Sequence, residues 1–448
     1  MNGCAASESA TDDSTRHEPR YGPCGRRGVT ARMQTVAAGI TLAVVVGVLA
    51  QRAVTHVDFP GRVEPARWVL QDFRDAVYYP VVAFLEGRNP YDQAAQARAY
   101  PVGQSFPLYL PLTLVAHLPF GLLPQADAGA LYFVVVIGLT AVLATLAIGG
   151  TGLPVTGAGV LGLTALLLLS RPGQMNLLIG QVTAQVAIGV YVALRWARTR
   201  PLLAGLGLAL STLKPTYGVL AAALMLFGRG DITAVFTGAV MSATLCLVAM
   251  IPLLRAAGSA PAFAASLGGS AAAFSAEPSS NAWSGFTRID VTALMARVLG
   301  HVPTGWTELA LVVLVVSAAI IGLRRLRTDQ SAPTVQLGVG LVCLTVLLAT
   351  YHQAYDALLL AQPAVALGTG RWGRGVVASA ALRWTVLALV AVPAANYLAT
   401  NTVVQRLSVG SPAWLAITAA NPAALLAAWL VHLRLACRVP AQRLCPQS

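Results

Sequence analysis

Four side chains that could act on a bound substrate follow the first long apolar segment. Asp72 and Asp75 stand three positions apart, and Tyr78 and Tyr79 begin three positions after Asp75. Positions i and i+3 share one face of a helix, so one carboxylate could act as a general base while the other orients it. The same pattern also fits a solvated loop helix in which Asp75 only pairs with Arg74 or Arg88.

A second group of polar side chains lies late in the chain. His352, Tyr355 and Asp356 have the i, i+3 and i+4 spacing of one helical face. A histidine at the end of an apolar segment also commonly serves as an interfacial hydrogen-bonding residue. Lys214, beside Pro215, could pair with a lipid phosphate as a point charge, or could extend along its apolar stem to the membrane interface.

The elements that must position these groups are membrane helices. Hydrophobic residues make up 56% of the chain, charged residues make up 10%, and the mean hydropathy is +0.68. Soluble proteins carry about 25% charged residues, whereas repeated apolar runs of about 18 residues or more are typical of membrane spans. The composition therefore predicts an all-α, polytopic helical membrane protein with about 10 to 12 spans.

The apolar runs divide the chain into a central membrane domain and two tails. Residues 1–32 are predicted to be a disordered cytoplasmic tail, 33–435 the multi-span domain, and 436–448 a second cytoplasmic tail. Residues 106–123 carry three prolines, which favours an interfacial or re-entrant helix. The expected spans cover residues 33–51, 126–148, 153–170, 182–197, 232–254, 306–323, 334–350, 354–369, 376–398 and 413–433.

Positive charge gives the chain an orientation. Arginines before residue 33 place the N-terminus inside, which puts Asp72 outside. The segment 202–227 is broken at Lys214 and Pro215, and we expect a hairpin, because a single span would place Arg229 outside. With the hairpin, the groups around residues 195–200, 229, 324–327, 371–374 and 434–438 all fall inside.

This threading brings the polar candidates to the outer face. Ionisable groups at membrane depth cost about 2.5 to 3.5 kcal/mol each, so several together indicate one shared aqueous site. Gln181 joins this group as a buried hydrogen-bond donor after Gly180, which could be a helix-packing glycine, and Arg288 joins it from a late external loop.

Several blocks of sequence, in this order, resemble glycosyltransferase family 87. They are Asp72-Phe73 followed by Tyr78-Tyr79, the run Leu85-Glu-Gly-Arg-Asn-Pro-Tyr91, the proline-rich segment 106–124, Gly180-Gln181, and Ala204-Gly205 leading to Leu213-Lys-Pro215. The resemblance covers residues 69–230, and more loosely 352–363. Relatives often have a Pro-Pro pair where this chain has Phe106-Pro107-Leu108-Tyr109, and a richer Gln-x-Asn pattern near Gln181, which leaves the donor and acceptor open.

The resemblance implies a type-C glycosyltransferase bundle with an extracytoplasmic site. The family's better-known members are mannosyltransferases that use polyprenol-phosphate mannose, and related arabinofuranosyltransferases. It implies inverting transfer of a hexose, with mannose expected, from a polyprenyl-phosphate sugar to a glycolipid or glycan acceptor at the cell membrane. Asp72 matches the catalytic base, and His352 matches a histidine in a late external loop.

The remaining candidate residues fit substrate binding in such a reaction. The leaving polyprenyl phosphate needs positive charge or hydrogen-bond donors, for which Lys214, Arg288 and His352 are candidates. Tyr78 and Tyr79 could line the sugar pocket. No cofactor is expected, and no metal either, because two aspartates make a poor cage for a divalent ion.

Other functional classes fit less well. The chain has a net charge of +13, but its basic residues form no patch with interleaved aromatic residues, which argues against a nucleic-acid partner. Six scattered cysteines indicate neither a disulfide framework nor a metal site. A transporter of a lipid-linked saccharide or a small solute remains the alternative, because broken helices with midplane charges are also transporter features. A purely structural scaffold would not explain the converging polar residues.

Overall fold

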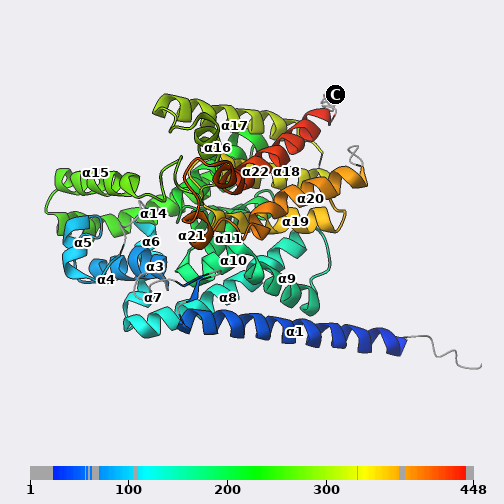
Figure 1. Ribbon diagram of the computed structural model, residues 1–448, viewed down its shortest axis with the longest axis horizontal. Coiled ribbons are helices and arrows are strands. Elements are labelled where there is room, and N and C mark those ends of the chain that lie inside the picture. Colours follow the sequence, from blue (N-terminus) through cyan, green and yellow to red (C-terminus); the bar gives the residue numbers. More distant parts are fainter. Residues whose placement is uncertain are drawn as a thin grey trace, which may run out of the picture.

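The computed structural model describes residues 24–55, 57–58, 61–62, 70–103, 109–329, 331–372 and 379–439. Helices of very different lengths make up the molecule (Figure 1). The long α1 (Cys24–Thr55) lies along one side and packs against α9 (Gly157–Leu169). The two-residue strands β1 (Val57–Asp58) and β2 (Gly61–Arg62) pair antiparallel after it, with Val57 opposite Arg62.

After α1, the described residues of the first half of the chain form six short helices before the long α8. After β2 come α3 (Gln71–Phe73), the π-helix η1 (Arg74–Tyr78), α4 (Tyr79–Leu85), α5 (Gln93–Ala99), α6 (Leu112–Ala116), α7 (Leu118–Gly121), α8 (Gln125–Gly150), α9, α10 (Arg171–Met175), the π-helix η2 (Asn176–Gly180), α11 (Thr183–Trp196), α12 (Pro201–Ser211), α13 (Pro215–Ala223) and the π-helix η3 (Leu224–Arg229).

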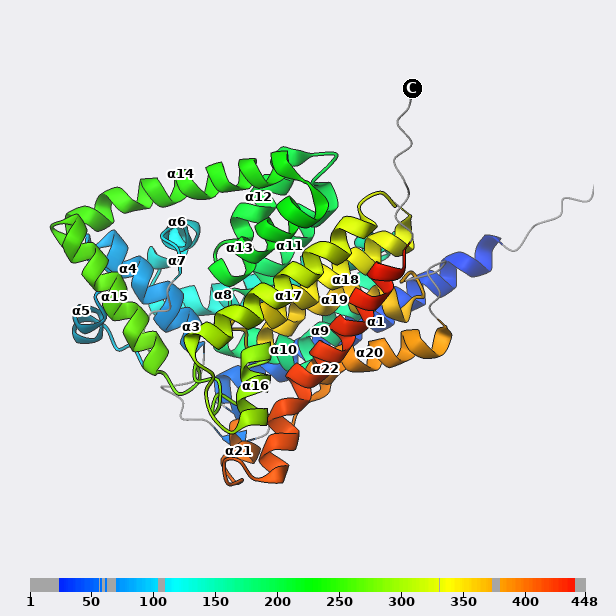
Figure 2. The ribbon, with the colours of Figure 1, turned by 90° about the horizontal axis from the view of Figure 1, so that it is seen from above.

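The second half has longer helices on the outside. It contains α14 (Ile232–Ala257), α15 (Ala260–Ala276), α16 (Val291–Leu299), α17 (Gly305–Leu326), α18 (Ala332–Ala349), the 3-10 helix η4 (Ala354–Leu360), α19 (Ala361–Gly368), α20 (Ala380–Ala395), α21 (Asn401–Val404) and α22 (Pro412–Arg438). Figure 2 shows α14 and α15 at the edge of the molecule, away from the crowded centre.

Among the described residues, six helices are long and apolar enough to cross a membrane: α1, α8, α14, α17, α18 and α22. The helical segments Arg171–Gly180 and Thr183–Trp196 meet at a bend of 120°, and they form a seventh crossing if they are counted as one broken span. Shorter apolar helices occupy 157–169, 201–211, 354–368 and 380–395. The protein is therefore a polytopic, all-α membrane protein, and the broken elements are what positions its polar groups.

The long helices differ sharply in their burial. In the most apolar window of α18, 83% of the residues are buried inside the protein, against 11% for α1 and 17% for α14. α18 packs against α17, α19 and α22, and Trp429 donates from its indole nitrogen to the Thr345 hydroxyl at 2.9 Å. α18 is thus the centre of the bundle, while α1 and α14 present apolar faces that lipid would cover.

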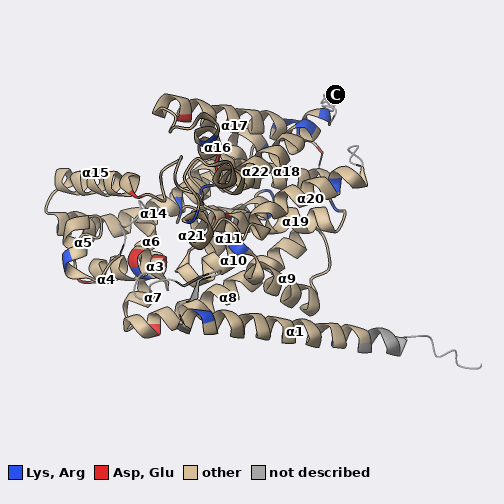
Figure 3. Cartoon of the chain, viewed as in Figure 1, with Lys and Arg blue, Asp and Glu red and all other residues tan. Residues whose placement is uncertain are grey.

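The segment 202–227 forms the expected hairpin. Its flanking residues meet, because Arg198 and Arg229 both contact the Asp231 carboxylate, at 3.5 and 2.6 Å. Arg324 donates to the Phe227 carbonyl at this same end. The arginines therefore gather at one end of the bundle, and Figure 3 shows further basic residues at the C-terminal end of α22.

The structure differs from the sequence prediction in three places. Residues 24–32 belong to α1 rather than to a disordered tail, and residues 1–23 lie outside the described part. α22 likewise continues to Arg438, past the predicted start of the second tail, whose residues 440–448 also lie outside the described part. The sequence predicts no helix between the expected spans 232–254 and 306–323, where the structure has α15 and α16, because neither of them is an apolar run of span length.

Candidate functional site

One turn connects the two carboxylates on which the candidate site is built. The Gln181 side-chain amide donates to Asp72 Oδ2, and two residues later the Thr183 hydroxyl donates to Asp356 Oδ1 at 3.0 Å. This turn lies at the 120° bend between η2 and α11. The bend therefore holds together side chains from the first and the last thirds of the chain.

Asp356 is the centre of a buried polar cluster. Its Oδ1 accepts from Lys214 Nζ at 2.9 Å in addition to Thr183, and its Oδ2 accepts from His352 Nδ1 at 3.1 Å and from the Gln353 backbone N–H at 3.0 Å. The side chains of Lys214 and Asp356 are only 8% and 3% exposed. A buried charge pair is tolerated when further hydrogen bonds satisfy it, and these donors satisfy the carboxylate.

The local sequence explains how Asp356 is presented. Gln353 and Asp356 form a reciprocal capping box at the start of η4, so the carboxylate is tied to its own helix. The preceding residues pair with a distant loop: Ile289 N–H donates to the His352 carbonyl at 2.9 Å, and Ala354 N–H donates to the Thr287 carbonyl at 2.8 Å. The His352 loop is thereby fixed on both sides.

Lys214 reaches the cluster because the hairpin breaks at that residue. α12 ends at Ser211, and Pro215, which has no N–H to donate, begins α13. The Lys214 ammonium lies 4.4 Å from the centre of the Tyr355 ring and also contacts the Thr183 hydroxyl at 3.3 Å. Lys214 is therefore a buried member of the site and does not extend to the surface.

Asp72 sits at the start of a distorted helical stretch. It belongs to the three-residue α3, which passes directly into η1 and follows Leu70, a non-glycine residue with φ of 49°. Such left-handed residues and π-helical turns recur at functional sites. Gly180 allows the close approach, because a Cβ there would lie 2.6 Å from the Phe73 Cβ, and its φ is 81°.

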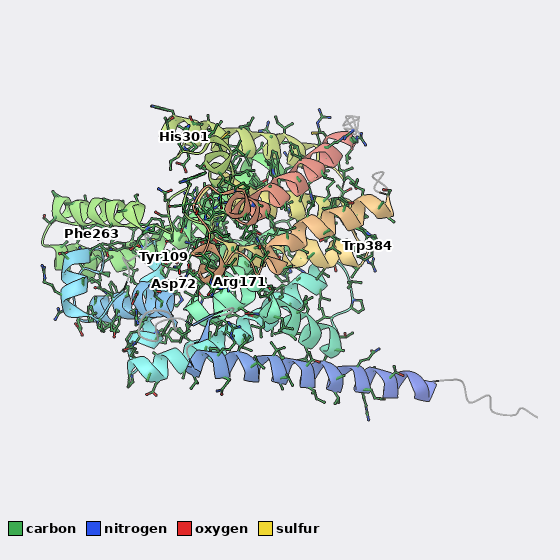
Figure 4. The ribbon with its side chains drawn as sticks, in the orientation of Figure 1. Asp72, Tyr109, Arg171, Phe263, His301 and Trp384 are labelled. Atoms are coloured by element: carbon green, nitrogen blue, oxygen red, sulfur yellow. The ribbon has the colours of Figure 1, made fainter. Side chains whose placement is uncertain are left out.

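Three tyrosines lie near both carboxylates. Tyr109, Tyr351 and Tyr355 each lie within electrostatic reach of both Asp72 and Asp356. Burial raises the pKa of the Tyr351 phenol, and the two carboxylates act in the same direction. Tyr109 is within electrostatic reach of Asp72, and Figure 4 labels both residues in the same region of the molecule. We call this group of three tyrosines and two carboxylates the chamber.

Arg288 contacts this chamber from the paired loop. Its guanidinium lies 5.0 Å from the centre of the Tyr351 ring, but it also binds both oxygens of Asp290 at 2.8 Å and the Ser280 carbonyl at 2.6 Å. The arginine therefore orders the loop that holds His352.

Three of the candidate residues face elsewhere. Both oxygens of the Asp75 carboxylate contact Arg74, at 2.7 and 3.2 Å, and one of them also accepts from the Gly103 N–H at 2.9 Å. The Tyr78 hydroxyl donates to the Leu123 carbonyl, and the Tyr79 hydroxyl donates to the Gln125 side chain. These hydrogen bonds tie η1 and α4 to the turn before α8.

Two members of the site were given no role in the sequence prediction. Asp356 was recognised only by its spacing from His352, and Thr183 was not selected at all. The i, i+4 spacing to His352 was the available signal for Asp356, whereas Thr183 has none, because its partners are distant in sequence. Among the described residues, no group of three or more His, Cys, Asp or Glu could hold a metal ion.

Comparison with known protein families matches the chain to Glycosyltransferase family 87 over residues 108–350, which is more than half of its length. No curated protein and no solved structure matches. The matched range contains Gln181, Thr183, Lys214 and Arg288, begins after Asp72 and ends two residues before His352. The chain belongs to glycosyltransferase family 87.

Proposed function

We propose that this membrane glycosyltransferase moves a hexose, with mannose the expected sugar, from a polyprenyl-phosphate donor to a hydroxyl group of a glycolipid or glycan. The observation that supports this reading most is the turn at 181–183, which ties Asp72 to the cluster of Lys214, His352 and Asp356. It holds a half-buried carboxylate near a cluster that contains the Lys214 ammonium, and an inverting transfer needs a base as well as a positive group for the leaving phosphate.

The two sides of the chamber would divide the chemistry. Asp72 would take the proton from the acceptor hydroxyl as its oxygen forms the new bond to the anomeric carbon. The bond between that carbon and the phosphate oxygen breaks on the opposite face, and the polyprenyl phosphate leaves with the electron pair. Negative charge then develops at the phosphate, where preorganised cations and hydrogen-bond donors lower the barrier.

Lys214 and His352 would contact the phosphate in this proposal. An ammonium group has three N–H donors, and the contacts to Asp356 and Thr183 use two of them. The His352 side chain is buried, and within the described residues its Nε2 has no hydrogen-bond partner. Lys214 thus retains an N–H for a phosphate oxygen, and His352 would offer a second one from Nε2 in its imidazolium form, because its Nδ1 already donates to Asp356.

Membership of a glycosyltransferase family favours an enzyme over a transporter. The decisive test is transfer of radiolabelled mannose from polyprenyl-phosphate mannose to endogenous lipids, in membranes with and without the protein. Parallel reactions with polyprenyl-phosphate glucose and arabinose would identify another donor. Failure with every donor, combined with protein-dependent uptake of a lipid-linked saccharide into vesicles, would support transport instead.

The proposed extracytoplasmic position of the site gives a labelling prediction. Cys437 is free and exposed at the arginine-rich end, and Arg406 is exposed in the loop between α21 and α22. In a background without other cysteines, Cys437 should react with an impermeant maleimide only after the cells are opened. Arg406→Cys should react in intact cells. Labelling of Cys437 in intact cells, with Arg406→Cys labelled only in opened cells, would show that the protein has the opposite orientation in the membrane.

A further inference from the structure

A cavity of about 450 Å³ lies at the end of the bundle where the arginines gather. Its lining includes Arg198, Arg229 and Arg327, with Asp231 as the only acidic residue among the lining residues described. Arg198 and Arg229 both contact that one carboxylate, at 3.5 and 2.6 Å. Three guanidinium groups against a single carboxylate leave the lining with excess positive charge.

The first turn of α14 adds to this preference for an anion. Ile232 and Thr233, its first two residues, belong to the cavity lining. The N–H groups at a helix start carry partial positive charge, and α14 is 26 residues long. Guanidinium groups and helix N–H groups are also the donors that proteins use most often for phosphate oxygens.

The surroundings of the cavity indicate which phosphate fits. Large apolar residues lie close in sequence to the lining residues, and their side chains are exposed on the bundle. The exposed fractions are 68% for Leu202, 53% for Phe227, 65% for Ile232 and 69% for Phe236. Figure 2 shows α12 beside α14, and the two helices pack together. A ligand bound there would have its charged group among arginines and its remaining atoms beside apolar side chains.

We propose that this cavity binds the headgroup phosphodiester of an anionic phospholipid whose acyl chains lie along α12 and α14. Basic pockets between membrane helices on the cytoplasmic side are suited to such headgroups. The cavity is separate from the proposed catalytic chamber, which lies at the tip of the 202–227 hairpin, whereas the cavity lies where the two ends of the hairpin meet.

The test uses the purified full-length protein in maltoside micelles, titrated with dioleoylphosphatidylglycerol, dioleoylphosphatidylcholine or inorganic phosphate. Native mass spectrometry then measures the bound lipid. We expect phosphatidylglycerol to bind at least tenfold more tightly than phosphatidylcholine. Arg198→Gln combined with Arg327→Gln should weaken phosphatidylglycerol binding by about fivefold for each arginine. Arg406→Gln, which removes an exposed charge at the other end, should have no effect.

A second variant keeps the test valid if the double variant does not fold. Thr233→Glu adds a negative charge to the cavity at a helix position where glutamate is favourable, so it should lower phosphatidylglycerol affinity without loss of thermal stability. Equal binding of the two lipids, or unchanged affinity in both variants, would overturn the proposal. Competition by millimolar inorganic phosphate would assign the cavity to a free anion instead.

Discussion

The two carboxylates of the chamber stand in opposite surroundings. Asp356 is buried and accepts four hydrogen bonds, from an ammonium, an imidazole, a hydroxyl and a backbone N–H. Asp72 is half-buried, and its Oδ2 accepts from the neutral Gln181 amide. A general base must reach its substrate and gain a proton, and a carboxylate saturated by cations does neither well.

The comparison also separates Asp72 from its neighbour Asp75. The two were equivalent by spacing, but Asp75 is buried and contacts the Arg74 guanidinium through both oxygens. This is the ion pair with Arg74 that the simpler reading of the sequence anticipated. Under the proposed function, Asp72 is the candidate for proton transfer, and Asp75 and Asp356 are candidates for positioning roles.

The largest expected effect is on catalysis. Asp72→Asn keeps the size of the side chain and an oxygen for Gln181, but removes the base, so we expect sugar transfer to fall by about 10²-fold to 10⁴-fold. Transfer of radiolabelled mannose to lipid acceptors measures the loss. Asp127→Asn, at an exposed acid in the first turn of α8, is the matched control. Near-normal turnover of Asp72→Asn would show that another residue is the general base.

The second effect is on stability. Asp356→Asn would leave the Lys214 ammonium buried without its counter-charge, which costs about 3 to 5 kcal/mol of the free energy of unfolding. Lys214→Met combined with Asp356→Asn removes both charges and should recover most of that loss. Denaturant unfolding in micelles measures both variants. A single variant as stable as wild type would show that the pair is not a structural element of the site.

The smallest effect concerns the close approach that positions Asp72. Gly180 has a φ of 81°, and the Cβ of Gly180→Ala would lie 2.6 Å from the Phe73 Cβ. Gly152 has a similar φ of 75°, but the Cβ of Gly152→Ala would meet no atom within 4 Å. The backbone cost of about 1 to 2 kcal/mol is common to both variants. The clash should add about 1 to 3 kcal/mol for Gly180→Ala alone and lower transfer, because α3 must shift. Equal stability of the two variants would contradict this packing.

The class of the protein and the position of its broken helices could be predicted from local sequence. Apolar runs of span length and arginines at their ends determine a polytopic bundle and its hairpin, because lipid imposes those patterns on each segment separately. The resemblance blocks around Asp72, Gln181 and Lys214 marked the correct family. Span counting was less secure, because short and bent helices lack a full-length apolar signal.

The roles of the charged residues were decided only by the tertiary structure. Lys214 and Asp356 are 142 residues apart in sequence, and Gln181 and Asp72 are 109 apart, so no periodicity connects them. Spacing made Asp72 and Asp75 equivalent, and it left Thr183 without any signal. The chain itself determined that polar groups must converge within the membrane domain. Packing of the bent helices decided which carboxylate became saturated and which stayed accessible, because burial and partners are set by neighbours distant in sequence.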